Sequence, residues 1–253
     1  MKIIINFCLL LGAGISVLAS PLDMELVVRL EKEGRYEEVL ELCQKAGESA
    51  ATLYLQGDYY YHGRKGVPRD KIRGNGYYRL ATGKLLPKAV EGNALAQYQL
   101  ARCHEYGRED MKEARKWYFK AADTGNAQAM YKAAMFAARR IEAREMGVNE
   151  ALELALRYAQ SASEAGNPDG KALLAWLKYI NCGERDFEGA LPLIMESVKD
   201  NSLLGKTLLG RMYYEGRGVE QDMAKAEQYL QDAVDQGFSE AWETLEEIKR
   251  QKE

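Results

Sequence analysis

The sequence predicts an all-α fold in which antiparallel helix pairs stack into an elongated array. Three observations support this fold class. The chain has only five prolines in 253 residues and is rich in residues that favour helices. A pattern of small residues, tyrosines and glycines recurs at intervals of roughly 33 to 41 residues, as expected of helical repeats. No segment resembles a β-strand.

Composition and charge narrow the possible classes of protein. Charged residues make up 29% of the chain and hydrophobic residues 47%, which favours a folded body over a disordered one. The formal net charge is −3, so no overall positive field would attract nucleic acid. We therefore do not expect a nucleic-acid partner.

The first twenty residues, MKIIINFCLLLGAGISVLAS, differ from the rest of the chain. A basic Lys2, an apolar run through Val17 and small residues at Ala19 and Ser20 are typical of a secretory signal peptide. We expect residues 1–19 to be removed after Ala19, which predicts a secreted or periplasmic protein. An uncleaved signal anchor is the alternative. No later segment is apolar for long enough to cross a bilayer.

Three cysteines remain after the predicted signal peptide: Cys43, Cys103 and Cys182. Their odd number and wide spacing do not indicate a disulfide framework. We expect small buried hydrophobic residues at these positions. A bridge between Cys43 and Cys103 is left open.

The first half of the repeated pattern is a small residue with tyrosine three positions later and glycine six positions later. It occurs three times, once with histidine in place of tyrosine: Gly57, Tyr60 and Gly63; Ala101, His104 and Gly107; Gly210, Tyr213 and Gly216. Small residues at these positions allow a neighbouring helix to approach closely. We expect this half to form the first helix of each unit.

The second half begins with an aspartate that has alanine four residues later. Such an aspartate is well placed to cap a new helix. An aromatic or aliphatic pair follows, and each unit ends at a glycine or asparagine that supplies a left-handed backbone. These expected exits are Gly92, Gly125, Gly166, Asn201 and Gly237.

The period and these landmarks together resemble Sel-one-like repeats, which are relatives of tetratricopeptide repeats. The family pattern is A-x3-LG-x2-Y-x2-G-x-GV-x2-D-x3-A-x2-WY-x-KAA-x2-G. The resemblance implies a right-handed α-solenoid that serves as a scaffold for other molecules. Five copies are expected, at about 50–92, 93–125, 126–166, 167–201 and 202–237.

Both ends of the array and two of its units differ from the pattern. Residues 20–49 resemble an ordinary tetratricopeptide-like helix pair broken at Gly34, and residues 238–253 resemble an amphipathic helix. We expect these segments to cap the array. Counting from Asp70 to Ala81 places an insertion, KIRGNGYYR, at the start of the first unit's second helix. The third unit has extra residues around 138–151.

The residues that could carry chemistry are few. The chain has two histidines: His104 falls on the tyrosine position of the repeat, and His62 precedes a loop glycine and is expected to be solvated. Neither has companions that predict a metal site or a catalytic triad. The motifs GRGV and GNG are best explained as repeat turns. We expect no cofactor, no metal and no catalytic residues.

Two surfaces could bind a partner. The positions after the small residue of each first helix are not determined by the repeat, and first helices of solenoids commonly line the inner curve. Aromatic residues, methionine and arginine at such positions are typical of binding centres, although packing between repeats is the alternative. The predicted groove residues are Asp58, Tyr59, Arg102, Phe136, Trp176, Arg211 and Met212.

The second surface is a basic loop in the first unit, RKGVPRDKIR. An anionic partner such as an acidic glycan or a phospholipid head group would suit it, and a solvated loop is the alternative. Its basic residues are Arg64, Lys65, Arg69, Lys71 and Arg73.

These observations predict an exported, non-catalytic scaffold that binds a protein or peptide through its concave face. Two alternatives stay open at this point. One is a cell-envelope enzyme or enzyme accessory that acts on peptidoglycan or another polymer. The other is recognition of an acidic glycan through the basic first repeat.

Overall fold

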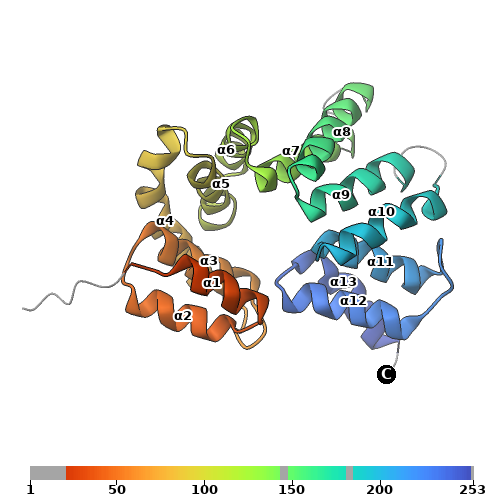
Figure 1. Cartoon of the computed structure of the whole chain (residues 1–253), viewed down its shortest axis with the longest axis horizontal. Coiled ribbons are helices and arrows are strands. Elements are labelled where there is room, and N and C mark those ends of the chain that lie inside the picture. The colour runs from red at the N-terminus through yellow and green to blue at the C-terminus, as the bar shows by residue number, and fades with distance from the viewer. Residues whose placement is uncertain (1–20, 143–147, 181–184, 252–253) are drawn as a thin grey trace, which may run out of the picture.

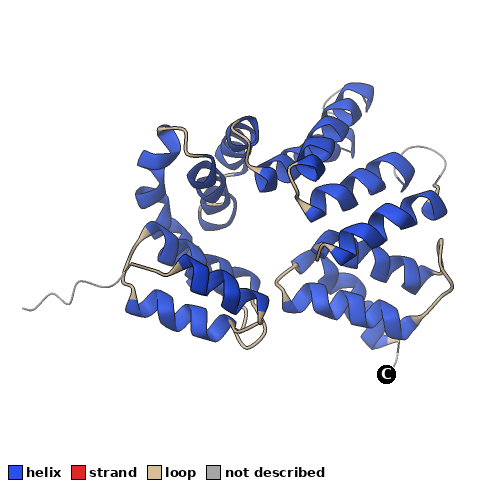
Figure 2. Ribbon diagram, viewed as in Figure 1, coloured by secondary structure: helices blue, strands red, loops and turns tan. Residues whose placement is uncertain are grey.

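The computed structural model describes residues 21–142, 148–180 and 185–251. The predicted signal peptide, residues 1–19, and Cys182 lie outside the described residues. The described part of the chain contains thirteen α-helices and no strand, apart from one isolated bridge between Arg64 and Val67. The predicted all-α fold class is therefore confirmed, and Figure 2 shows helices joined by short loops.

The chain begins with a helix pair and continues as five further pairs. The N-terminal pair is α1 (Met24–Lys32) and α2 (Tyr36–Lys45), which flank Gly34 with a φ of 70°. The five pairs are α3 (Ala50–His62) with α4 (Lys71–Val90), α5 (Ala94–Arg102) with α6 (Met111–Asp123), α7 (Ala127–Glu142) with α8 (Val148–Glu164), α9 (Pro168–Ala175) with α10 (Phe187–Lys199), and α11 (Leu203–Glu215) with α12 (Met223–Asp235). A 3₁₀ turn, η3 (Ser239–Ala241), and α13 (Trp242–Arg250) follow the last pair.

Two of the first helices continue into a π-helical turn. These turns are η1 (Cys103–Gly107), after α5, and η2 (Trp176–Ile180), after α9. Each begins beside a predicted groove residue, since Arg102 precedes η1 and Trp176 opens η2. The wider turn changes the direction in which the following side chains leave the helix.

Helix starts follow one rule in the five pairs wherever the structure describes the capping residue. First helices are capped by serine or asparagine, whose side chains accept a backbone N–H: Ser49, Asn93, Asn126, Asn167 and Ser202. Second helices are capped by aspartate in the same way: Asp70, Asp110, Asp186 and Asp222. The backbone N–H of each of these aspartates also donates to a carbonyl near the end of the preceding helix, at Tyr60, His104, Tyr179 and Tyr213 respectively. The aspartate thus joins both helices of its unit.

The left-handed exits predicted from the sequence are confirmed. Their φ values are 92° at Gly92, 95° at Gly125, 79° at Gly166, 63° at Asn201 and 86° at Gly237. Two glycines of the first helices also cannot be replaced by a residue with a side chain unless a neighbouring residue moves. A Cβ atom at Gly57 would lie 2.9 Å from the Tyr78 ring, and one at Gly210 would lie 2.8 Å from Leu230. The close packing of α3 on α4 and of α11 on α12 therefore depends on these glycines.

The expected insertion at the start of α4 is wrong. Asp70 caps α4 as Asp110 caps α6, and Gly74 then takes the place of Ala114, with its Cα against the backbone of Tyr61. The extra residues instead lengthen α4 at its C-terminal end. As a result α4 has 20 residues, whereas α6, α10 and α12 each have 13. The equivalence of Gly74 and Ala114 was missed in the sequence because alanine was expected at this position.

Cys43 and Cys103 are buried free thiols and do not form a bridge. They belong to different hydrophobic clusters, one in the N-terminal pair and one in the first two units. Burial raises the pKa of Cys43 to about 11 and that of Cys103 to about 12. No helix in the described stretches is both long and apolar enough to span a bilayer.

The array curves until its two ends meet, as Figure 1 shows. The backbone N–H of Lys65, in the α3–α4 loop, donates to the carbonyl of Asp235 at the end of α12, with an N–O distance of 3.1 Å. Gly237 lies against Arg64, so that a Cβ atom there would overlap Arg64 Nη1 and approach the Gly63 carbonyl to 3.0 Å. The solenoid is thus a closed ring.

Replacing Gly237 by alanine tests this closure. Both Gly237→Ala and Gly92→Ala place a Cβ on a left-handed backbone, which costs about 1–2 kcal/mol. Only the Gly237 side chain displaces Arg64, since nothing lies within 4 Å of a Cβ at Gly92. We expect urea denaturation to show a larger loss of unfolding free energy for Gly237→Ala, by about 3 kcal/mol if a buried ion pair is broken.

In an Arg64→Ala background the difference between these two variants should become much smaller, with only the approach to the Gly63 carbonyl remaining. Equal losses in the Arg64-containing protein would contradict a closed ring.

Candidate functional site

The inner side of the ring holds a polar cavity of about 400 Å³. The first helices α3, α5, α7 and α9 all contribute to it, as do the α3–α4 loop and the segment after α12. Its charged lining residues are Glu31, Asp58, Arg64, Arg102, Lys132, Asp169 and Glu240. Because the lining comes from distant units, the cavity exists only when the ring is assembled.

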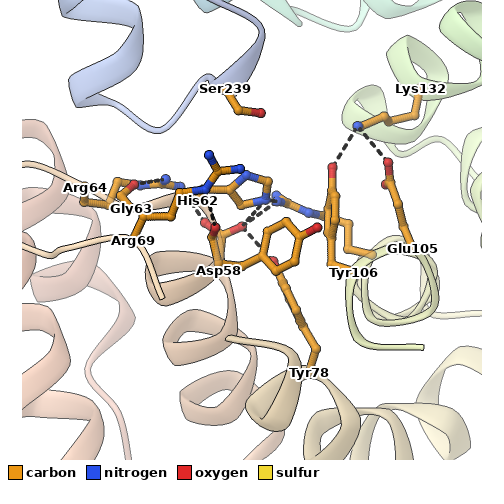
Figure 3. Close-up of polar contacts among 12 residues, drawn as sticks. Asp58, His62, Gly63, Arg64, Arg69, Tyr78, Glu105, Tyr106, Lys132 and Ser239 are labelled. Carbon is orange, nitrogen blue, oxygen red and sulfur yellow. Dashed lines mark hydrogen bonds and ion pairs between the residues drawn. The ribbon is translucent and has the colours of Figure 1, made fainter. Parts of the chain in front are cut away.

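Asp58 is the centre of this cavity. Its carboxylate accepts from Arg64 Nη2 at 2.5 Å, contacts Arg102 Nη2 at 2.5 Å, and accepts from the Tyr78 hydroxyl at 3.1 Å. The Asp58 side chain is only 9% exposed. Burial alone would raise the pKa of Asp58, but the two guanidinium groups outweigh it and hold this pKa well below its usual value. Figure 3 shows Asp58 beside Arg64 and His62.

His62 is not solvated, contrary to the sequence-based expectation. Its side chain is 9% exposed and its Nε2 lies 2.8 Å from Arg102 Nη2. Burial, together with the two nearby arginines, lowers the pKa of His62 to about 3, although Asp58 acts in the opposite direction. Since the arginine can only donate, neutral His62 accepts at Nε2. The imidazole was expected in water because it precedes a loop glycine, but ring closure covers that loop.

A second polar group faces this one from the neighbouring units (Figure 3). Lys132 Nζ lies 3.4 Å from the Tyr106 hydroxyl and 3.7 Å from Glu105 Oε1. Glu105 also accepts from the Tyr118 hydroxyl at 2.5 Å. Burial tends to raise the pKa of Glu105, but Lys132 and the hydroxyl lower it overall. The carboxylate therefore stays ionised and holds Lys132 at the cavity wall.

A less polar cavity of about 380 Å³ adjoins the first one. It lies between α7, α9, α11 and the segment that precedes α13. Its apolar lining includes Met135, Leu173, Trp176, Leu204 and Leu208. Three residues line both cavities, namely Tyr131, Phe238 and Glu240. The inner face thus forms one continuous groove with a polar half and an apolar half.

Four of the predicted groove residues line this groove and three do not. Asp58 and Arg102 meet in the polar half, whereas Trp176 and Arg211 lie in the apolar half. Tyr59 is 1% exposed and donates to Glu31, and Met212 is 3% exposed in the core of the last units. Phe136 is partly buried and packs against the Tyr118 ring.

Sequence reasoning missed the groove residues that lie one helical turn earlier. Tyr54, Tyr98, Lys132 and Thr207 each precede a candidate position by four residues, and all four line the groove. Residues four apart lie on the same side of a helix. This spacing would have found them. His62 follows Asp58 by the same spacing, whereas Phe238 carries no comparable signal because ring closure brings it to the groove.

The five basic residues of the predicted anion-binding loop lie in two different environments. Arg64 is held by Asp58 and by the Gly63 carbonyl, whereas Lys65, Arg69, Lys71 and Arg73 are exposed. The Arg73 guanidinium stacks on the Tyr60 ring, with 4.0 Å between its carbon and the ring centroid. No group of three or more histidine, cysteine, aspartate or glutamate side chains within the described stretches could hold a metal ion.

Comparison with known proteins identifies the repeat. The sequence profile of the Sel1 repeat matches residues 50–82, 94–126, 127–167 and 205–238. The chain belongs to the Sel1 repeat family. The resemblance seen in the sequence is therefore confirmed. Residues 168–204 fall outside these matches, yet α9 and α10 in this stretch also pack as a pair.

Several bacterial proteins are similar to this Sel1 repeat protein. The Sel1-repeat-containing protein YjcO of Escherichia coli K12 is 31% identical over 165 residues, which are 62% of this chain and 69% of YjcO. A Sel1 repeat protein from Oxalobacter formigenes of known crystal structure is 24% identical, with a TM-score of 0.46 over 89% of each chain. A protective antigen of uropathogenic Escherichia coli with an SLR fold is 23% identical, with a TM-score of 0.46 over 88% of this chain and 47% of the antigen.

The buried histidine predicts a dependence of stability on pH. The pKa of His62 lies below that of an unfolded histidine, so below about pH 6.5 protons bind the unfolded chain preferentially. The free energy of unfolding should therefore fall as the pH decreases from about 6.5 toward 3, by up to about 1.4 kcal/mol per pH unit. Urea denaturation at pH 7 and pH 5 measures this.

His62→Gln keeps an acceptor for Arg102 and should remove most of that loss. The chain has only two histidines, so His104→Gln is a matched control. The pKa of His104 is also lowered by its burial, but its environment is more open. A loss that is the same in wild type and His62→Gln would contradict a neutral, buried His62.

Proposed function

We propose that this Sel1 repeat protein is an exported, non-catalytic scaffold that binds a peptide segment of a partner protein along its inner groove. Sel1 repeats typically act as scaffolds for protein interaction, which supports the general class. The observation that carries the proposal is the continuity of the two cavities through Tyr131, Phe238 and Glu240. Such a groove suits an extended segment better than a compact small molecule.

The two halves of the groove favour different side chains of the ligand. Trp176, Leu173 and Leu208 offer an apolar surface for one or two large hydrophobic side chains. The polar half offers arginine and lysine together with Asp169 and Glu240, so it suits a charged or hydrogen-bonding segment. Ion pairs already hold Arg64, Arg102 and Lys132 in place, so little side-chain entropy of these three residues is lost on binding.

The same geometry argues against Asp58 or His62 as the general base that the enzyme alternative would need. A general base needs a free acceptor within reach of a substrate proton. Asp58 is saturated by two guanidinium groups and a tyrosine hydroxyl, and His62 already accepts from Arg102. The arrangement instead supports a structural role for both residues. Glycan recognition through the basic loop is also less favoured, because Arg64 is paired with Asp58 inside the ring.

A displayed library of random peptides would test groove binding directly. We expect it to yield peptides with large apolar side chains, whose affinity is then measured by fluorescence anisotropy. Trp176→Ala should weaken binding at least about tenfold, as is usual for a buried aromatic hot spot. Trp242→Ala is the matched control, because Trp242 is 39% exposed and does not line the groove.

Equal affinity of wild type and Trp176→Ala for every selected peptide would contradict groove binding, and so would a library that yields no binder. Unchanged thermal unfolding of Trp176→Ala shows that a loss of affinity is not a loss of fold.

Export is the second part of the proposal and rests on residues 1–19. We expect the protein recovered from cells of its source to begin at Ser20, as shown by the mass of the intact chain. A protein that retains Met1–Ala19 in the cytoplasmic fraction would contradict export and leave the groove proposal unaffected.

A further inference from the structure

The outer face of α4 is unusually apolar. Of the ten large hydrophobic side chains that are exposed in the described residues, four lie on α4 and a fifth, Leu95, lies at the start of α5. Those on α4 are Ile72, at 87% exposure, Leu80, at 54%, Leu86, at 44%, and Val90, at 70%. The other second helices have no such concentration among the described residues. This face therefore needs an explanation beyond chance exposure.

Three of these side chains share one side of α4. With 3.6 residues per turn, Ile72, Leu86 and Val90 lie within about 40° of one another around the helix, opposite the buried Ala81. Gly76 and Gly83 lie between them and have no other atom within 4 Å of a Cβ position. The face is convex, and α4 lies at the outer edge of the ring (Figure 1).

The same helix is strongly basic. It carries five basic residues and no acidic one, although the whole chain has a net charge of −3: Lys71, Arg73, Arg79, Lys84 and Lys88. All five are exposed, and none forms an ion pair within the described part of the chain.

We propose that the outer face of α4 docks on an anionic lipid surface. Exposed aliphatic side chains flanked by lysine and arginine are what an interfacial helix presents to a bilayer, where the basic groups reach the head groups. A convex helix with two bare glycines has no pocket to recognise a folded acidic protein. A lipid surface needs no such complementarity, because its head groups rearrange around the helix.

The proposal explains a departure from the repeat. The extra turns at the C-terminal end of α4 carry Leu86, Lys88 and Val90, so the longer helix supplies a large part of the face. The groove faces the opposite way, toward the centre of the ring. A protein docked through α4 would keep its inner face available for a partner.

Co-sedimentation of the full chain with vesicles tests the docking. We expect binding to vesicles of phosphatidylcholine mixed with phosphatidylglycerol, weaker binding to phosphatidylcholine alone, and a decrease as salt is raised. Any binding through residues 1–19 is common to all variants and does not depend on α4. The comparison between variants therefore isolates the α4 face.

Two double variants separate the charge from the apolar surface. Lys84→Gln/Lys88→Gln should weaken binding about fivefold per charge, and Ile72→Ser/Val90→Ser should weaken it by at least a similar factor. The matched controls are Lys45→Gln/Lys199→Gln and Met111→Ser/Met195→Ser, which change exposed residues on other helices and should bind like wild type. All of these side chains are exposed, so thermal unfolding should be unchanged.

Three outcomes would overturn the proposal. One is binding that does not depend on phosphatidylglycerol, and another is binding by both α4 variants equal to wild type. The third is a loss with Lys84→Gln/Lys88→Gln but none with Ile72→Ser/Val90→Ser, together with full competition by soluble heparin. That third result would assign α4 to a soluble polyanion instead of a membrane.

Discussion

The buried carboxylate of Asp58 is the interaction on which the assembled ring depends. It binds Arg64 from the α3–α4 loop and Arg102 from the next unit, both at 2.5 Å. Arg64 in turn lies against Gly237 after the last helix pair. One carboxylate therefore links the first, second and fifth units. Because an unpaired guanidinium in this site would be strongly unfavourable, the three parts are held together by a requirement for charge neutralisation.

Closure has a consequence for recognition. An open solenoid buries only the contacts between neighbouring units, and its curvature can change as those contacts flex. Here the groove is bounded by residues from both ends of the chain, with Phe238 and Glu240 facing Tyr131 across the inner side. A ligand in this groove meets walls that are already positioned. Binding can then depend on shape and a few side chains without ordering a mobile surface.

The sequence predicted the local structure well because caps and exits are local. The cap at Asp222 involves only hydrogen bonds with the backbone of Lys225 and Tyr213, which are near in sequence. The exit at Gly237 depends only on the backbone angle of that residue. Closure could not be predicted in this way, since small rotations accumulate over five units before Lys65 meets Asp235. The environment of His62 and the position of Phe238 in the groove followed from closure and were missed for the same reason. The site was therefore predicted in part, through Asp58, Arg102, Trp176 and Arg211.

The amide of Lys65 offers the most direct test of the closed ring. Its N–H donates to Asp235, whereas the nearby Val67 N–H donates to Arg64 within the same loop. Hydrogen–deuterium exchange followed by NMR reports both amides in one experiment. A closed ring predicts protection at Lys65 in the wild type, and loss of that protection in Asp58→Asn while Val67 stays protected. Unprotected exchange at Lys65 in the wild type, beside a protected Val67, would contradict closure.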